Sequence, residues 1–105
     1  MSRFNMILEL YGEEYVLRQL AEECNELAQA ALKLIRVWRH ETPMREDEAR
    51  ERLVEEIADV HLMGGVVFRH ILSAAEQECA DDICEQKRER MFARLLDGKM
   101  ESDVW

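Results

Sequence analysis

The chain has 105 residues, of which 48% are hydrophobic and 35% charged, with one proline and four glycines, a composition typical of one folded domain and not of a disordered segment. Its formal net charge of −9 argues against a nucleic-acid partner, because binding to a phosphate backbone requires a clustered basic surface. An anionic nucleotide stays compatible with this charge if metal ions bridge it to acidic side chains.

The cysteines and the apolar segments indicate the cellular compartment of the protein. Cys24, Cys79 and Cys84 are odd in number and lack C-x-x-C spacing, which is typical of reduced thiols. The first fifteen residues lack the basic and apolar regions of a signal peptide, and the apolar run around "HLMGGVVF" is too short to span a bilayer. We therefore expect a cytoplasmic protein without a membrane partner.

The first half of the chain predicts two helices separated by Gly12. A short helix is expected over residues 3–10, and a long one over residues 13–38. The long helix carries one apolar stripe with a 3.6-residue period, made of Leu17, Leu20, Ala21, Cys24, Leu27, Ala28, Ala31, Leu34 and Ile35. No strand-like alternation is found along the sequence, so the expected fold class is all-α.

The second half predicts two more helices. Thr42 before Pro43 favours an N-cap followed by proline at the first helical position, so a third helix is expected from residue 43 or 44 to residue 71 or 72. "SAAE" at residues 73–76 has capping-box spacing and predicts the start of a fourth helix, which ends near Asp97 with Gly98 after it. We expect a single domain over residues 1–98 and a flexible tail over residues 99–105.

The third helix is apolar around nearly its whole circumference between Ile57 and Phe68. This pattern is typical of a helix that is covered on all sides, which so short a chain can hardly achieve alone. Gly64 and Gly65 in its interior each cost about 1 kcal/mol of helix stability, which close approach of a neighbouring helix or a kink would explain. We therefore expect oligomerisation, most simply a two-fold dimer with the third helices at its centre.

Two acidic groups flank the apolar stripes of the long helices. "EECNE" places Glu22, Glu23 and Glu26 on one sector of the second helix, and "EEIAD" places Glu56 and Asp59 beside apolar positions of the third. If the helices pack antiparallel, these carboxylates form one cluster, whose hard oxygen ligands suit Mg²⁺ or Mn²⁺. A di-iron bundle would need Glu-x-x-His, which the sequence lacks.

These segments resemble a known family. "EECNE", followed about thirty residues later by "EIAD", is similar to the E-E-x-x-E and E-x-x-D signature of the MazG-like, all-α nucleoside triphosphate pyrophosphohydrolases. "LYGEEYVLRQLAEECNELAQAALKLIR" resembles the opening helices of small phage and bacterial members, and "EQKRERMFARL" resembles their terminal K-x-x-R segment through Lys87 and Arg90. The resemblance covers roughly residues 6–96.

The resemblance implies a fold, a reaction and a set of functional residues. Family members are antiparallel helical bundles, assembled as dimers or dimers of dimers, that use Mg²⁺ to cleave an NTP or dNTP into the monophosphate and pyrophosphate. It implies that the metal ligands are Glu23, Glu26, Glu56 and Asp59. Glu22 would be an outer ligand or a water-orienting base, and Lys87 and Arg90 would hold phosphate oxygens.

Other interpretations of the same residues stay open. Lys33, two turns beyond Glu26, is a further candidate for phosphate binding, with a solvated lysine as its alternative. Glu56 has Arg52 four residues before it, so a plain surface ion pair is an alternative to metal binding. At the level of function, the alternatives are a non-catalytic helical adapter of the same fold, or a pyrophosphohydrolase that acts on phosphoribosyl-ATP or another modified nucleotide.

Overall fold

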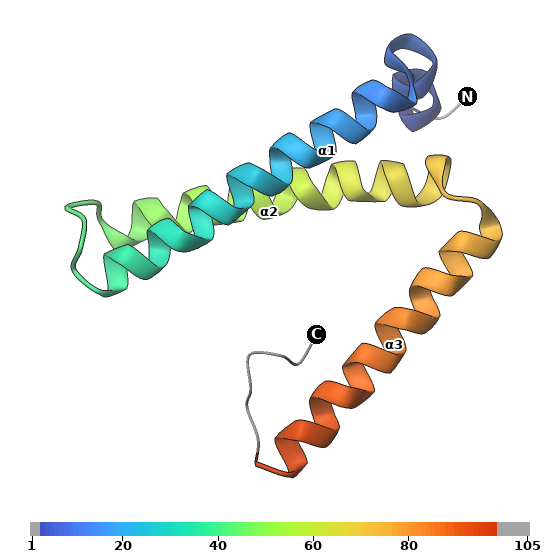
Figure 1. The fold of residues 1–105 in the computed structure, drawn as a ribbon. Coiled ribbons are helices and arrows are strands. Elements are labelled where there is room, and N and C mark those ends of the chain that lie inside the picture. Colours follow the sequence, from blue (N-terminus) through green and yellow to red (C-terminus); the bar gives the residue numbers. More distant parts are fainter. Residues whose placement is uncertain (1–2, 99–105) are drawn as a thin grey trace. The chain divides into compact units, whose positions relative to one another are not determined.

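The computed structural model describes residues 3–98, and all regular secondary structure within this range is helical (Figure 1). Its elements are α1 (Arg3–Trp38), α2 (Glu46–Val66), the π-helical segment η1 (Val67–Ile71) and α3 (Ala74–Leu96). The expected all-α class is confirmed. One compact unit ends at Ile71 and a second begins at Leu72, so α1, α2 and η1 are described together and α3 by itself. The expected tail, residues 99–105, lies outside the described residues.

Gly12 divides α1 as the sequence predicts. Its φ of 85° and ψ of 166° lie outside the helical region, so the residues before it and the residues after it form two helices joined by a kink. This backbone conformation is essentially restricted to glycine, because a Cβ atom would collide with the neighbouring carbonyl groups. The helix that carries the first acidic group therefore starts at the expected place.

The end of α1 is closed by a Schellman motif. The His40 backbone N–H donates to the Val37 carbonyl at 3.1 Å, and the Glu41 N–H donates to the Arg36 carbonyl at 2.9 Å. His40 occupies the left-handed position of this motif with a φ of 58°. These bonds satisfy the last carbonyl groups of α1 and turn the chain back toward α2.

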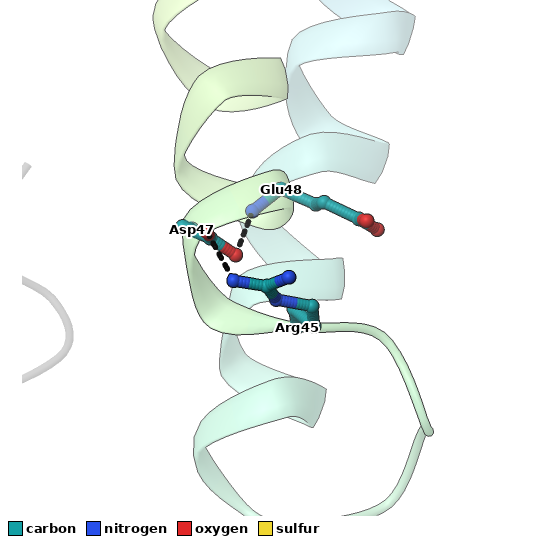
Figure 2. A network of polar contacts seen from close by, with 3 residues as sticks. All are labelled: Arg45, Asp47 and Glu48. Carbon is teal, nitrogen blue, oxygen red and sulfur yellow. Dashed lines mark hydrogen bonds and ion pairs between the residues drawn. The ribbon is translucent and has the colours of Figure 1, made fainter.

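The expected start of the third helix is wrong by two to three residues. Its N-cap is Arg45 in extended conformation, not Thr42, and no side chain caps it. At the first turn, Asp47 accepts a hydrogen bond from the Glu48 backbone N–H at 3.0 Å and pairs with the Arg45 guanidinium at 2.9 Å (Figure 2). A contact from α1 also stabilises a helix start at Glu46, because the Trp38 indole N–H donates a hydrogen bond to the Glu46 carboxylate.

Helices α1 and α2 run side by side in opposite directions and share the core of the first unit (Figure 1). Near their connection, Leu34, Val37 and Ala49 are buried together, with Met44 and Leu53 packed around them. Val16 and Val66 are buried toward the other end of the helix pair. This packing fixes the register in which the acidic residues of the two helices meet.

Only part of the apolar surface of these helices is covered. On α1, Leu34 of the expected stripe is buried, but Leu17, Cys24 and Ile35 are exposed. On α2, Ile57 and Leu62 are both 51% exposed, so the segment expected to be covered on all sides is not covered within one chain. A Cβ atom built on Gly64 would meet no described atom within 4 Å, so close helix packing within the chain does not explain that glycine.

The third expected helix ends where the sequence predicts, at Ile71, but its last turn is not α-helical. The α-helical pattern stops at Val66, and Val67–Ile71 continue as one π-helical turn. Local widening of this kind is rare and carries no residue signature that periodicity could detect. The fourth helix follows as predicted: Ser73 and Glu76 form both bonds of a capping box, Asp97 is the C-cap and Gly98 has a φ of 73°.

No helix among residues 3–98 combines the length and the apolar character needed to cross a membrane.

Candidate metal centre

The antiparallel packing of α1 and α2 brings three predicted ligands together. Glu23 comes from α1, and Glu56 and Asp59 come from α2, where they stand three residues apart on one face. One carboxylate oxygen from each residue lies within 4.8 Å of the others. Three negatively charged groups therefore converge on a space small enough for a single cation.

Burial makes this convergence costly for the protein alone. Glu56 is only 7% exposed, and among the described residues it is the one buried polar or charged residue. The Oε2 atoms of Glu23 and Glu56 are both buried without a hydrogen-bond partner. Carboxylate oxygens are normally hydrogen-bonded when they are removed from water, so these two atoms fit contact with a cation or with a proton.

The electrostatics of the cluster agree with its geometry. Burial is the main cause that raises the pKa of Glu23 above its ordinary value, and the charges of Asp59, Glu26 and Glu56 raise it further. Burial likewise raises the pKa of Glu56, with a further rise from Glu26 and Asp59 and a partial offset from Arg52. Glu23 and Glu56 thus favour their protonated forms when no metal is bound, and a divalent cation would replace the protons.

The two other predicted acids occupy different positions. Glu26 lies near enough to raise the pKa of both Glu23 and Glu56, although it is outside the set whose oxygens meet within 4.8 Å. Glu22 is exposed and also outside that set. The structure therefore brings together Glu23, Glu56 and Asp59, with Glu26 beside them and Glu22 on the outer surface.

The predicted phosphate-binding residues fall into two groups. Lys33 lines a cavity of about 400 Å³ between α1 and α2, together with Gln29, Ala30, Arg36, Met44 and Arg52. Lys87 and Arg90 lie on α3 in the second unit, where Lys87 lines a cavity of about 290 Å³ with Cys84, Arg88 and Met91. Their contact with phosphate stays a prediction.

Sequence reasoning missed Arg36 and considered Arg52 only as a partner of Glu56. A usable signal existed for Arg36, because Lys33 and Arg36 are three residues apart and so share a helix face. The position of Arg52 opposite that face depends on the register of α1 against α2, which the sequence pattern leaves open.

Comparisons with protein-family models, with curated proteins and with solved structures found no match. Membership of the MazG-like family therefore stays a prediction from the quoted segments. The function is inferred from the geometry of the site together with that resemblance.

Proposed function

We propose that this chain is a Mg²⁺-dependent nucleoside triphosphate pyrophosphohydrolase of the MazG-like type, which cleaves an NTP or dNTP into the monophosphate and pyrophosphate. The observation that carries the proposal is the convergence of Glu23, Glu56 and Asp59 from two helices within 4.8 Å. Acidic clusters are common on protein surfaces, but this one includes two buried carboxylate oxygens without a partner. The resemblance of "EECNE" and "EIAD" to the family signature supplies the class of reaction.

The residues present fit a hard divalent cation. All donors are carboxylate oxygens, which suit Mg²⁺ and its substitute Mn²⁺, and Glu23, Glu56 and Asp59 would hold the ion with Glu26 beside them. Mg²⁺ sites commonly use few protein carboxylates and complete the shell with water and substrate phosphates. When bound, such an ion neutralises charge on the polyphosphate and activates water for hydrolysis.

The side chains of this chain have separate tasks in the proposed reaction. A water oxygen forms a bond to the α-phosphorus, and the bond from that phosphorus to the oxygen bridging to the β-phosphate breaks, releasing pyrophosphate. Glu22, which is exposed and outside the converging set, would act as an outer metal ligand or would orient the water and accept its proton. The resemblance further implies that Lys87 and Arg90 would contact phosphate oxygens of the substrate, where their positive charges would offset its negative charge.

We also propose that the working form is a dimer or a dimer of dimers in the cytoplasm. Support comes from the exposed apolar residues of both long helices, since large apolar side chains on one face favour contact with another protein surface. On α2 the exposed large apolar side chains are those of Val54, Ile57 and Leu62. A second copy of the chain is the partner that the symmetry of small soluble proteins favours.

The direct test is turnover of a panel of NTPs and dNTPs with Mg²⁺, scored for pyrophosphate release. At least one substrate should give pyrophosphate, and Glu26→Gln should lose most of the rate because a carboxylate of the cluster is neutralised. Glu51→Gln is a matched control, because Glu51 is exposed on α2 and outside the cluster. Lack of turnover across the panel, or full activity in Glu26→Gln, would contradict the proposal.

A further inference from the structure

A second charged site lies further along the α1–α2 pair than the acidic cluster, and its sign is opposite. The cavity of about 400 Å³ between α1 and α2 is lined by three cationic side chains, those of Lys33, Arg36 and Arg52. The remaining lining residues are Gln29, Ala30 and Met44, so no carboxylate lines this cavity. In a chain with a net charge of −9, three cations around one cavity need an explanation.

Ion pairs do not account for Lys33 and Arg36, whereas Arg52 also interacts electrostatically with the Glu56 carboxyl of the cluster. The ion pairs found among residues 3–98 use other arginines, and none of them includes Lys33, Arg36 or Arg52. The helix dipole favours Arg36, which lies in the last turn of α1, but Lys33 and Arg52 lie further from a C-terminus. Like charges so placed repel one another until an anion binds between them.

The position of the cavity connects it to the cluster. Gln29 follows Glu26 by three residues on α1, and Arg52 precedes Glu56 by four residues on α2. One helical turn advances about 5.4 Å, so Arg52 lies about one turn before Glu56 on α2, and Lys33 lies about two turns beyond Glu26 on α1, in the same direction along the antiparallel pair. The groups that suit a metal and the groups that suit phosphate therefore follow each other along the α1–α2 pair.

We propose that the cavity lined by Lys33, Arg36 and Arg52 binds the pyrophosphoryl group of a nucleoside triphosphate. The guanidinium groups of Arg36 and Arg52 suit phosphate oxygens, which they can bind through paired N–H donors, and Lys33 adds a third charge. The volume exceeds the needs of a single phosphate and is within the range of small-ligand sites. That the pyrophosphoryl group belongs to a nucleotide rests on the proposed function. That the cavity binds an anion of this kind rests on the lining residues alone.

The geometry also gives the cavity a defined shape before any ligand binds. Arg36 belongs to the Schellman motif that ends α1, where its carbonyl accepts the Glu41 N–H at 2.9 Å. Met44 lies both against the buried core and in the cavity lining. A wall built on ordered backbone lowers the entropy lost when the anion binds.

The test is calorimetric titration with inorganic pyrophosphate in EDTA, where no metal contributes. The wild-type protein should bind, and Arg36→Gln should bind about tenfold more weakly because one charge-assisted contact is lost. Arg18→Gln is the matched control, since Arg18 is an exposed arginine of α1 that pairs with Glu14 and lies outside the cavity. Arg36 and Arg52 are exposed, so their substitution should leave the fold intact.

Competition identifies the source of the pyrophosphoryl group. Displacement of pyrophosphate by an NTP but not by a monophosphate supports a substrate site, and binding of free pyrophosphate alone supports a product site in the same cavity. Absence of pyrophosphate binding, or binding unchanged in both Arg36→Gln and Arg52→Gln, overturns the proposal. Pyrophosphate binding without NTP turnover would support the anion site in the cavity and contradict the proposed reaction. Turnover of NTP without pyrophosphate binding would support the proposed reaction and contradict the anion site.

Discussion

At the scale of single residues, the decisive feature is a pair of carboxylate oxygens that the fold removes from water without supplying donors. The Oε2 atoms of Glu23 and Glu56 have no hydrogen-bond partner, and burial raises the pKa of both side chains. A protein without a ligand for this cluster would gain stability by replacing these acids with neutral residues. The proposed cation would offset this cost.

The raised pKa values predict how the stability of the metal-free protein changes with pH. Because Glu23 and Glu56 have folded-state pKa values above their ordinary 4.5, the folded state binds more protons than the unfolded state in the range just above that value. The stabilisation is fully present below about pH 4.5 and is lost as the pH rises through the folded-state pKa values. In urea unfolding with EDTA across this pH range, the free energy of unfolding should fall less with rising pH for Glu56→Gln than for wild type.

Glu51→Gln serves as the control for that comparison, since it removes an acid of α2 outside the cluster. The free energy of unfolding of Glu51→Gln should fall with rising pH as much as that of wild type. Equal declines in wild type and Glu56→Gln would show that Glu56 does not hold a proton in the folded protein.

Added Mg²⁺ should stabilise the folded protein because it binds the assembled cluster and not the unfolded chain. At a concentration about a hundredfold above Kd, Tm should rise by roughly 10 °C. Asp59→Asn should remove most of this response, since the variant lacks one of the three converging carboxylates. Thermal melts of wild type and Asp59→Asn with and without Mg²⁺ make the comparison, and a response that survives in Asp59→Asn would place the metal elsewhere.

At the scale of elements, local chemistry explains which helix ends were predictable. Gly12, Gly98 and the Ser73–Glu76 capping box act through their own backbone conformations and short-range bonds, so the sequence pattern predicts these ends correctly. The start of α2 was missed because Arg45 makes no side-chain cap and a contact from Trp38 to Glu46 favours the observed position. At this helix start, the tertiary contact from Trp38 outweighs the local preference for an N-cap at Thr42.

The Schellman motif at the end of α1 gives a prediction about stability. His40 adopts a φ of 58°, a left-handed conformation that costs residues with a Cβ atom and suits glycine. His40→Gly should therefore stabilise the protein by about 0.5 to 1 kcal/mol. Arg39→Gly, at the neighbouring position without a positive φ, should instead destabilise it, and urea unfolding of both variants measures the difference.

A destabilising effect of His40→Gly comparable to that of Arg39→Gly would contradict this account. It would mean that the histidine side chain, and not the backbone conformation, determines stability at this position.

At the scale of the whole molecule, the sequence predicted that the acids of two helices would meet but not how much apolar surface one chain can cover. Glu23, Glu56 and Asp59 were predictable because their spacing beside apolar stripes forces them toward the helix interface. The basic cavity was not, because it depends on the register that places Arg52 opposite Lys33 and Arg36. The exposed apolar residues are the observation on which the proposal of an oligomer rests.

The exposed apolar face of α2 predicts self-association. Sedimentation velocity at micromolar concentration should show a dimer or a larger species, and Ile57→Lys should shift it toward the monomer because it places a charge in the apolar contact. Glu51→Lys, which also introduces lysine on α2 but at an exposed charged position, should leave the association unchanged. A monomer at all accessible concentrations would contradict the oligomeric proposal.

The central claim is that the carboxylate cluster directs water to the α-phosphorus, and hydrolysis in ¹⁸O-labelled water tests it most directly. With Mg²⁺ and the best substrate of the panel, mass spectrometry should find the label in the monophosphate and none in pyrophosphate, and Asp59→Asn should form little of either product. Label in pyrophosphate would show attack at the β-phosphorus. Label in orthophosphate would show a different hydrolase, and either result would contradict the account.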